Sequence, residues 1–356
     1  MEAIKQKYRF SIKPVIGRLG VPTLLVGGFW ILTMIVGVMN GIKLPMMISD
    51  TLGRFGRWGI LTLAMVPPIQ SGTGPNFALP IGMLCGSLAA ACAIQWGFTG
   101  WGFLIFAVLL AVVIAVAVGY LYGMLMNAVK GSEMVIATYT GLASVFLFCM
   151  LWYILPFSNT KLRLPMGQGL RQDVMMESIG ARGILDKLLS FEIGGVAVPT
   201  GMFLVFFLAC FLVWLFMRSK SGLAITAGGT NPKFANAAGI NVNRGRIFAN
   251  IISTALAAVG LIIYAQSYGF LQYYQFALWL AFTAVASIIV GGATVKRATV
   301  FNVILGCMIY QGISATTPPV ANALFGGTEL PETIRTIVQN GVILYALTQV
   351  RGGGGK

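Results

Sequence analysis

Long apolar runs, separated by short polar segments, recur from one end of the chain to the other. They lie at about residues 21–38, 58–70, 77–95, 101–127, 134–155, 199–217, 247–270, 275–293, 298–317 and 333–350, and all but the second contain at least 18 residues. A helix needs about 20 apolar residues to cross the hydrocarbon core of a bilayer. The pattern therefore predicts an all-α polytopic membrane protein with about ten transmembrane helices.

The second run is short and ends abruptly. It closes with Pro67-Pro68, and the polar segment Ser71-Gly72-Thr73-Gly74-Pro75-Asn76 precedes the third run. An ordinary helix cannot continue through such a pair, because proline lacks the amide hydrogen and its ring clashes with the preceding turn. Irregular backbone at membrane depth is tolerated only against protein or a water-filled cavity. We therefore predict a helix break that faces the protein interior or a cavity.

Small residues are spaced for close helix packing. The chain has 45 glycines, including the four-residue spacings Gly82/Gly86 and Gly119/Gly123. Such pairs let helix backbones approach each other, although they are common in polytopic proteins of every function.

Composition agrees with a lipid environment. Hydrophobic residues make up 57% of the chain and charged residues 9%, against about 25% charged residues in soluble domains. The net charge of +15 would suggest nucleic acid binding in a soluble protein. In membrane proteins, however, Lys and Arg collect in cytoplasmic loops. We therefore expect a lipid bilayer, and no nucleic acid, around this chain.

The distribution of charge predicts the orientation. With the N-terminus inside and alternating spans, 15 of the 24 basic residues fall on the cytoplasmic side with two acids, and the outside receives nine basic and seven acidic residues. This asymmetry predicts that both the N- and C-termini are cytoplasmic. Residues 157–198 form a long external loop of mixed charge, and residues 218–246 form a basic cytoplasmic loop. No low-complexity linker divides the chain, so we expect a single domain, 1–356.

Few groups suit catalysis or metal binding. The chain has no histidine, and its five cysteines lie in apolar runs without a CxxC pair: Cys85, Cys92, Cys149, Cys210 and Cys307. No GxxxxGK[ST] phosphate-binding loop is present either. We therefore expect no catalytic residue and no metal site, and we do not expect an enzyme.

Energy for any transport would come from outside the chain. Carriers driven by protons keep an acid or a histidine buried in the bilayer, whereas the acids here fall in loops or near the ends of spans. Arg54, Arg57 and Arg335 are expected near an outer boundary, where long side chains can reach water. A charge-poor interior suits a neutral or weakly polar solute.

The cytoplasmic loop contains a short predicted helix, Pro232–Ala238. Asn231 is a good N-cap, Pro232 fits the first helical position, and Gly239 fits the C-terminal stop. A helix of one to two turns is not stable alone in water. It should therefore pack on other parts of this chain or on a partner.

The segment Arg218–Gln266 carries a wider pattern. Gly229-Thr230-Asn231-Pro232 is followed by Ala238-Gly239-Ile240-Asn241-Val242, Arg244 and a helix rich in Ser, Ala and Gly. This pattern resembles the permeases of the branched-chain amino acid and ribose-type ABC import family, which have a type II ABC importer-like fold. Ser287–Ala293 is similar to the family's Gly-Gly-Thr break, and Asn302, Gly306 and Gly312 follow it as expected. The resemblance covers most of the chain.

The resemblance implies a role for the short cytoplasmic helix. It makes the short cytoplasmic helix a coupling helix that sits in a cleft of an ATP-hydrolysing subunit, formed by Asn231, Pro232, Ala235, Ala238, Gly239 and Ile240. The helix break itself makes the residues around it candidates for the translocation pathway, and two glutamines near the outer ends of later spans are secondary candidates: Gln70, Ser71, Thr73, Asn76, Phe77, Gln266 and Gln311. The alternative for each is an ordinary helix–helix contact.

The assembly implied by the resemblance has several parts. It contains two ATP-binding subunits that hold ATP and Mg, a second permease copy or a sister permease, and an external solute-binding protein. The chain itself needs no cofactor, and its place is the cytoplasmic (inner) membrane of a bacterium or archaeon.

The substrate class follows less directly. Many sugar permeases of the family carry Gly-Gly-Ile-Asp-Leu-Ser where this chain has Ser71–Ala78, and Val295-Lys296-Arg297 replaces a second glycine cluster. We expect an ATP-driven importer of a small polar solute, a monosaccharide first, then a nucleoside or purine, then a branched-chain amino acid. The alternative class is an ATP-independent secondary transporter or channel, which would tolerate changes at residues 231–239. A membrane enzyme would need a cluster of reactive side chains.

Overall fold

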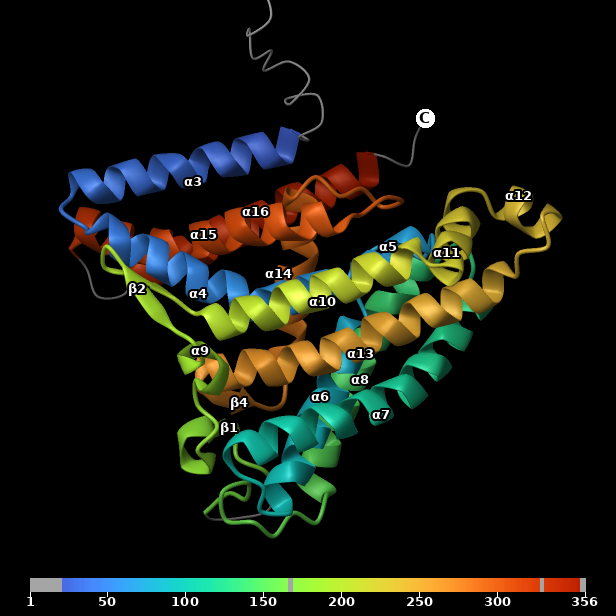
Figure 1. Cartoon of the computed structure of the whole chain (residues 1–356), viewed down its shortest axis with the longest axis horizontal. Coiled ribbons are helices and arrows are strands. Elements are labelled where there is room, and N and C mark those ends of the chain that lie inside the picture. The colour runs from blue at the N-terminus through green and yellow to red at the C-terminus, as the bar shows by residue number, and fades with distance from the viewer. Residues whose placement is uncertain (1–20, 166–168, 327–329, 353–356) are drawn as a thin grey trace, which may run out of the picture.

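Helices account for most of the chain. The computed structural model describes residues 21–165, 169–326 and 330–352. Within them the helices are α3 (Val21–Met39), α4 (Leu44–Leu63), α5 (Val66–Gln70), α6 (Leu79–Gln95), α7 (Gly100–Ala128), α8 (Glu133–Ile154), α9 (Ile184–Lys187), α10 (Thr200–Arg218), α11 (Lys220–Thr230), α12 (Pro232–Ala237), α13 (Val242–Tyr268), α14 (Phe276–Val290), α15 (Val300–Phe325) and α16 (Leu330–Gly352) (Figure 1).

Each apolar run of the sequence coincides with at least one of these helices. By length and composition, six of the described helices can cross a membrane, namely α3, α7, α8, α10, α13 and α15, and α6 and α14 are shorter apolar helices. The prediction of an all-α polytopic membrane protein is thereby confirmed. The number of spans and the side on which the termini lie remain predictions.

Helix α13 lies at the centre of the packing, against α6 and α7. Glycines allow this approach: a Cβ atom at Gly82 would lie 2.4 Å from the Thr254 carbonyl oxygen, and one at Gly86 would lie 2.4 Å from that of Ala258. On α7, a Cβ at Gly123 would lie 2.9 Å from the Ile247 Cα. Both predicted small-residue spacings are therefore confirmed as helix contacts.

The other long helices differ in how much of their surface they bury. Of the most apolar stretch of each helix, 61% is buried in α13 and 67% in α15, but 17% in α8 and 28% in α7. Helix α15 packs on α4 and α3. The apolar side chains that α7 and α8 leave uncovered suit contact with lipid tails rather than water.

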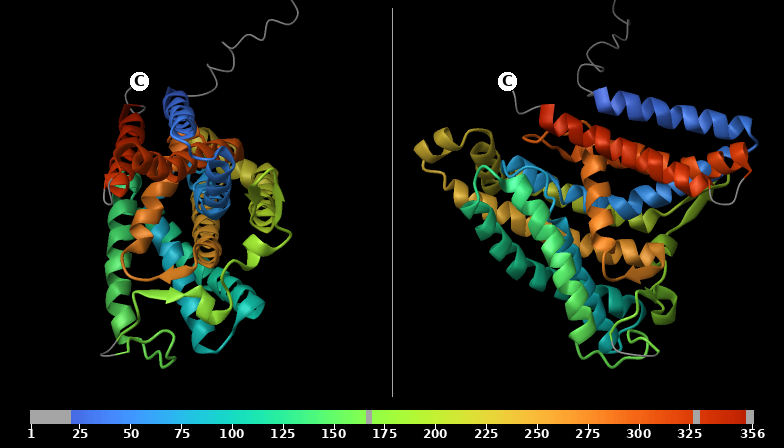
Figure 2. Two further views of the ribbon diagram at one scale, coloured as in Figure 1. Left: turned by 90° about the vertical axis from the view of Figure 1, so that its left-hand side faces the viewer. Right: turned by 180° about the vertical axis from the view of Figure 1, so that it is seen from behind.

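Short strands lie at one end of the helix bundle, and α11 and α12 lie at the other (Figures 1 and 2). Strands β1 (Asp173–Met175) and β4 (Phe270–Gln272) pair antiparallel, as do β2 (Phe191–Ile193) and β3 (Val196–Val198). The loop 157–198 thus holds strands as well as α9 and the 3₁₀ helix η2 (Met176–Ile179). The loop 218–246 is mostly helical.

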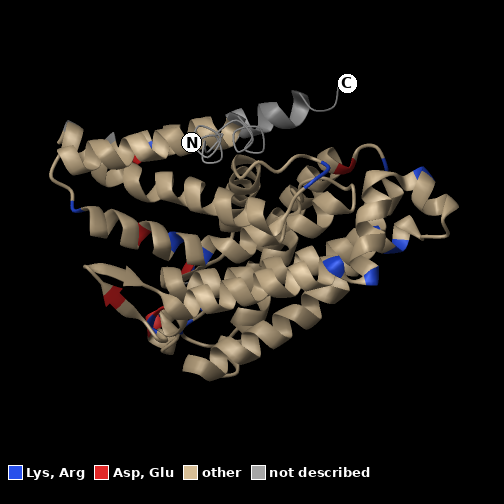
Figure 3. Cartoon of the chain, turned by 45° about the horizontal axis from the view of Figure 1, so that its top comes forward, with Lys and Arg blue, Asp and Glu red and all other residues tan. Residues whose placement is uncertain are grey.

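Charge separates the two ends (Figure 3). Near α11 and α12 the described charges are basic, with one acid, Glu133, which pairs with Arg246. The strand-bearing end carries both signs. This is the asymmetry used to predict orientation, and it favours the α12 end as the cytoplasmic one. The predicted basic N-terminal segment, 1–18, lies outside the described residues.

The second helix is longer than its apolar run predicts. Helix α4 begins at Leu44, about 14 residues before the predicted start at residue 58, and contains Asp50, Arg54 and Arg57. At 1.5 Å per residue, Arg54 lies about 15 Å along the helix from its first residue. The predicted start is late because the hydropathy pattern excludes the amphipathic first half of α4. That Arg54, Arg57 and Arg335 lie near an outer boundary stays a prediction.

Candidate functional site

The short helix α12 forms as its sequence predicts. The Asn231 side chain accepts a hydrogen bond from the Phe234 amide at 3.1 Å, and Pro232 occupies the first helical position. Gly239 adopts a φ of +79°, and the Ile240 amide donates to the Ala235 carbonyl at 2.9 Å. A left-handed residue at this place ends the helix in the usual way, and glycine adopts it without strain. The predicted helix and its two caps are confirmed.

Helix α12 projects from the end of the bundle (Figure 1). Ala235 is fully buried within this turn, whereas the Phe234 ring beside it is 68% exposed. On α11, Leu223 is 60% exposed. Pro232 and Ala238 are also exposed. Two large apolar side chains at the polar, basic end of a membrane protein form a surface suited to contact with another protein.

The helix break lies at this same end and rests on α11. The Thr226 hydroxyl donates to the Gln70 Oε1 at 2.8 Å, and the Gln70 Nε2 donates to the Ala298 carbonyl at 2.5 Å. Backbone meets backbone next to these bonds: a Cβ atom at Gly229 would lie 2.1 Å from the Gln70 carbonyl oxygen. A displacement of α11 would therefore act directly on the break.

The remaining side chains of the break are held by the protein itself. The Ser71 and Thr73 hydroxyls both donate to the Pro68 carbonyl. Asn76 donates to Ser253 and accepts from Tyr122. These three predicted pathway residues are buried and hydrogen-bonded within the chain. The fourth, Phe77, packs its ring near that of Phe282, with centroids 6.4 Å apart.

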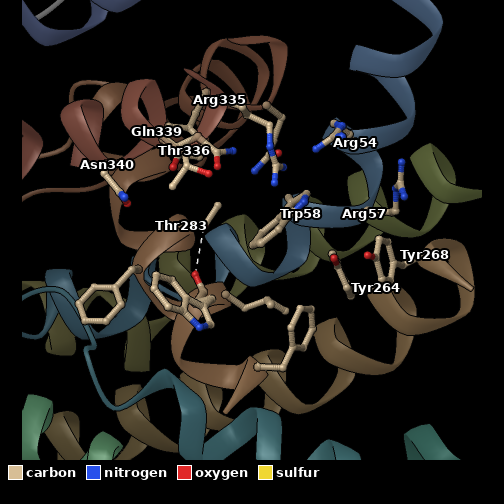
Figure 4. A pocket seen from close by; sticks show the side chains of 16 residues that line it. Arg54, Arg57, Trp58, Tyr264, Tyr268, Thr283, Arg335, Thr336, Gln339 and Asn340 are labelled. Atoms are coloured by element: carbon tan, nitrogen blue, oxygen red, sulfur yellow. Dashed lines mark hydrogen bonds between the residues drawn. The ribbon is translucent and has the colours of Figure 1, made fainter. Parts of the chain in front are cut away.

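A cavity of about 670 Å³ lies toward the strand-bearing end, where α13 ends at Tyr268 and β4 begins at Phe270. Figure 4 shows this cavity from close by. Five helices line it, namely α4, α13, α14, α15 and α16. Most of its aromatic lining comes from Trp58, Tyr264, Tyr268, Phe276, Trp279 and Phe282, and its polar lining from Arg54, Arg57, Gln311, Arg335, Thr336, Gln339 and Asn340. Phe282, which contacts Phe77, thus connects this cavity to the break.

Three arginines meet at the cavity, and their charges act on one another. Arg335 of α16 pairs with Glu332, while Arg54 and Arg57 of α4 form no ion pair within the described residues. The Arg57 Nε donates to the Gly53 carbonyl at 3.2 Å. The buried amide nitrogen of Gln311 has no hydrogen-bond partner in the described part of the chain.

The two glutamines predicted for the pathway separate in the structure. Gln311 lines the cavity. Gln266 is fully buried outside it and connects α13 to the strand-bearing end, because its Oε1 accepts from the Leu185 amide at 3.3 Å and its Nε2 lies 3.5 Å from Asp186.

The sequence does not predict that the three arginines come together, because they lie on α4 and α16, two helices that are far apart in the chain. The one available signal is a spacing of three to four residues that places polar and aromatic side chains on one helix face: Asp50, Arg54, Arg57 and Trp58. This spacing predicts an amphipathic helix, but it does not show which other helix packs against that face. Among the described residues, no group of His, Cys, Asp and Glu is placed to hold a metal ion.

Comparison with known proteins places the chain among transporters. A family-wide sequence profile described as "branched-chain amino acid transport system / permease component" matches residues 47–347. The nucleoside ABC transporter permease protein NupB of Lactococcus lactis subsp. cremoris (strain MG1363) is 21% identical over 309 residues, covering 83% of this chain and 80% of that protein. A solved structure presented as the inward-facing conformation of an ABC transporter assigned to the metal-chelate type aligns with a TM-score of 0.46 and 15% identity, covering 90% of this chain and 98% of that one. Because the profile spans most of its length, this chain belongs to the family of branched-chain amino acid transport system permease components and is a permease component of an ABC transporter.

Proposed function

We propose that the chain is the membrane-spanning subunit of an ATP-driven importer of a small polar solute. The observation that carries this proposal is α12, a capped helix that projects from the basic end, exposes Phe234 and joins the helix break through α11. In this proposal α12 is the coupling helix and docks on an ATP-binding subunit. The permease is not itself catalytic, so two such subunits hydrolyse ATP and hold its Mg.

The proposed route for the solute runs between the two ends of the molecule. Solute delivered by an external binding protein enters the arginine-lined cavity, passes the Phe77–Phe282 contact and leaves beside the break. ATP-driven closure of the partner subunits moves α11 and α12, and the Gln70–Thr226 hydrogen bond passes this motion to the break. Alternation between two such states is the usual form of a ligand-biased switch. A second permease copy or a sister chain completes the pathway.

Among the substrate classes, the nucleoside class receives most support. The relative named above is described as a nucleoside transporter permease. The cavity offers the rings of Trp58, Tyr264 and Tyr268 and the amides of Gln311 and Gln339, and flat rings stack well on nucleobases while amides bond to their edges. A monosaccharide, the class first expected, and a branched-chain amino acid are the competing substrates that a transport assay must include.

Removal of the exposed ring on α12 tests the docking proposal. We expect Phe234→Asp to reduce the amount of ATP-binding subunit that co-purifies with the full chain from native membranes by about tenfold or more, because a buried aromatic anchor commonly dominates an interface. Quantitative mass spectrometry of the purified complex measures this ratio. Phe234 is a sharper choice than Ala235, since a charge at the buried Ala235 would disrupt α12 itself.

The matched control is Phe191→Asp, which places the same change on an exposed ring of β2 at the opposite end. We expect this variant to keep the ATP-binding subunit. If Phe234→Asp keeps it as well, α12 is not the docking helix. If no ATP-binding subunit accompanies the wild-type chain and the chain alone moves solute, a secondary transporter or channel replaces this proposal.

A further inference from the structure

We infer that the arginine-lined cavity binds a negatively charged group, a carboxylate or a phosphate, on the solute that the protein carries. This inference rests on the proposed importer function and changes the expected substrate from a neutral nucleoside to an acid. The residues that carry it are Arg54 and Arg57 on α4 and Arg335 on α16. Figure 4 shows the three arginines on the same side of the cavity as Trp58.

The cavity carries an excess of positive charge. Its described lining includes three arginines and no acid. Two acids of the described residues lie close to these arginines but outside the cavity lining: Asp50 is exposed one turn before Arg54, and Glu332 pairs with Arg335 from a side chain that is 64% exposed. Like charges that line one cavity repel one another, and clustered cations of this kind in a membrane protein usually serve a ligand or a charged partner. An anion in the cavity would supply the missing partner.

The donors also have the right form. A guanidinium presents paired N–H groups whose geometry matches a carboxylate or a phosphate, and bonds of this type are among the strongest hydrogen bonds in proteins. Within the described residues Arg54 and Arg57 form no ion pair, so their guanidinium groups are not already occupied by an acid of this chain.

The aromatic lining restricts the rest of the ligand. Trp58, Tyr264 and Tyr268 stand next to the arginines, with centroid distances of 5.2 Å between the first two and 5.3 Å between the second two. A flat ring packs on such faces, and an arginine stacks there as well. The inferred solute is therefore a ring-bearing acid, of which a nucleoside phosphate and an aromatic carboxylate are the simplest examples.

The test compares probes that differ in one charged group. Binding of radiolabelled inosine 5′-monophosphate and inosine, and of benzoate and benzamide, is measured by equilibrium dialysis on the full chain in phosphatidylcholine nanodiscs. We expect at least one acid to bind about tenfold or more tightly than its neutral counterpart, the effect of a charge-assisted hydrogen bond. Arg54→Gln and Arg335→Gln should reduce this preference to about twofold or less.

The matched control is Arg182→Gln, which removes an exposed arginine at the same end of the molecule that lies outside the cavity. It should leave the preference unchanged. Thermal unfolding of each variant identifies any variant that fails to fold. The comparison of the four probes on the wild-type chain tests the inference even if a variant does not fold. Equal binding of acids and neutral counterparts by the wild type, or a preference that survives in both arginine variants, overturns the inference.

A lipid headgroup could supply the same phosphate chemistry, so the dialysis is repeated in nanodiscs that contain phosphatidylglycerol. Acid binding that persists there supports a solute site. Acid binding that phosphatidylglycerol abolishes assigns the cavity to a lipid and overturns the inference. The same preparations are also checked for the ATP-binding subunit. If they retain it, loss of acid binding counts against this inference and not against the importer proposal, which the Phe234→Asp experiment decides.

Discussion

At the scale of single residues, Asn76 shows how the helix break is held. Its amide nitrogen donates to the Ser253 hydroxyl at 2.9 Å, and its oxygen accepts from the Tyr122 hydroxyl and the Ala78 amide, both at 3.0 Å. The side chain is buried, so these bonds cannot be exchanged for water. One asparagine therefore connects the break to α7 and α13, and the irregular backbone is satisfied from inside the protein.

Replacement of Asn76 should show what this connection contributes. We expect Asn76→Ala to lower the free energy of unfolding by about 1–3 kcal/mol for each buried partner left unsatisfied, as measured by equilibrium unfolding in detergent micelles. Tyr122→Phe, which removes one bond and leaves the others, should cost about 0.5–1.5 kcal/mol. Asn40→Ala, at an exposed position, is the control and should change little. Equal effects of Asn76→Ala and Asn40→Ala would show that the network is not stabilising.

Local chemistry predicts some residues well and others poorly. The caps of α12 depend on Asn231, Pro232 and Gly239, which are neighbours in sequence, so their roles can be read from the chain. Arg54 and Arg335 line the same cavity although they are 281 positions apart in the sequence, and no local rule relates them. The three arginines line one cavity, which the expectation of a charge-poor interior did not anticipate, because it treated each of them as a separate side chain near an outer boundary.

At the scale of elements, the contact of α6 with α13 determines how the centre of the molecule packs. Gly86 lies against the Ala258 carbonyl, and Gly82 lies one turn earlier against Thr254. No side chain fits between the two backbones. The contact should therefore respond to added volume more strongly than lipid-facing surfaces do.

A methyl-bearing side chain at Gly86 tests this contact. We expect Gly86→Val to reduce the yield of folded protein and to lower the midpoint of thermal unfolding, because the added atoms would overlap α13 and overpacking typically costs about 1–3 kcal/mol. Gly28→Val is the matched control, since nothing lies within 4 Å of a Cβ at that position of α3. An unfolding midpoint for Gly86→Val that equals that of Gly28→Val would show that α6 and α13 can separate without loss of stability.

Helices were easier to predict than strands for a physical reason. An apolar run predicts a helix from local sequence alone, because all backbone hydrogen bonds of a helix form within one segment. Strand β1 finds its partner β4 almost 100 residues later, with Asp173 opposite Gln272, and three-residue strands leave no periodic signal. Helix α11 also went unpredicted, because its polar residues resemble those of a loop until Thr226 meets Gln70.

At the scale of the whole molecule, contacts lead continuously from one end to the other. The exposed face of α12 lies beyond α11, α11 bonds to the break through Gln70, Phe77 after the break contacts Phe282, and Phe282 lines the arginine cavity. The basic end carries the surface proposed for the ATP-binding subunit, and the cavity lies toward the opposite end. A protein arranged in this way suits transport driven by a partner at one face.

The most direct test of this central claim is ATP-driven accumulation of solute in proteoliposomes that contain the complex purified through this chain. The vesicles contain ATP. The binding protein and a panel of labelled solutes (nucleosides, nucleoside monophosphates, ribose and leucine) are added outside, and vesicles that contain ADP serve as the reference. We predict accumulation of at least one solute that requires internal ATP and is lost with Phe234→Asp but kept with Phe191→Asp. Accumulation that proceeds equally with ADP inside, or that survives Phe234→Asp, would contradict an ATP-driven pathway coupled through α12.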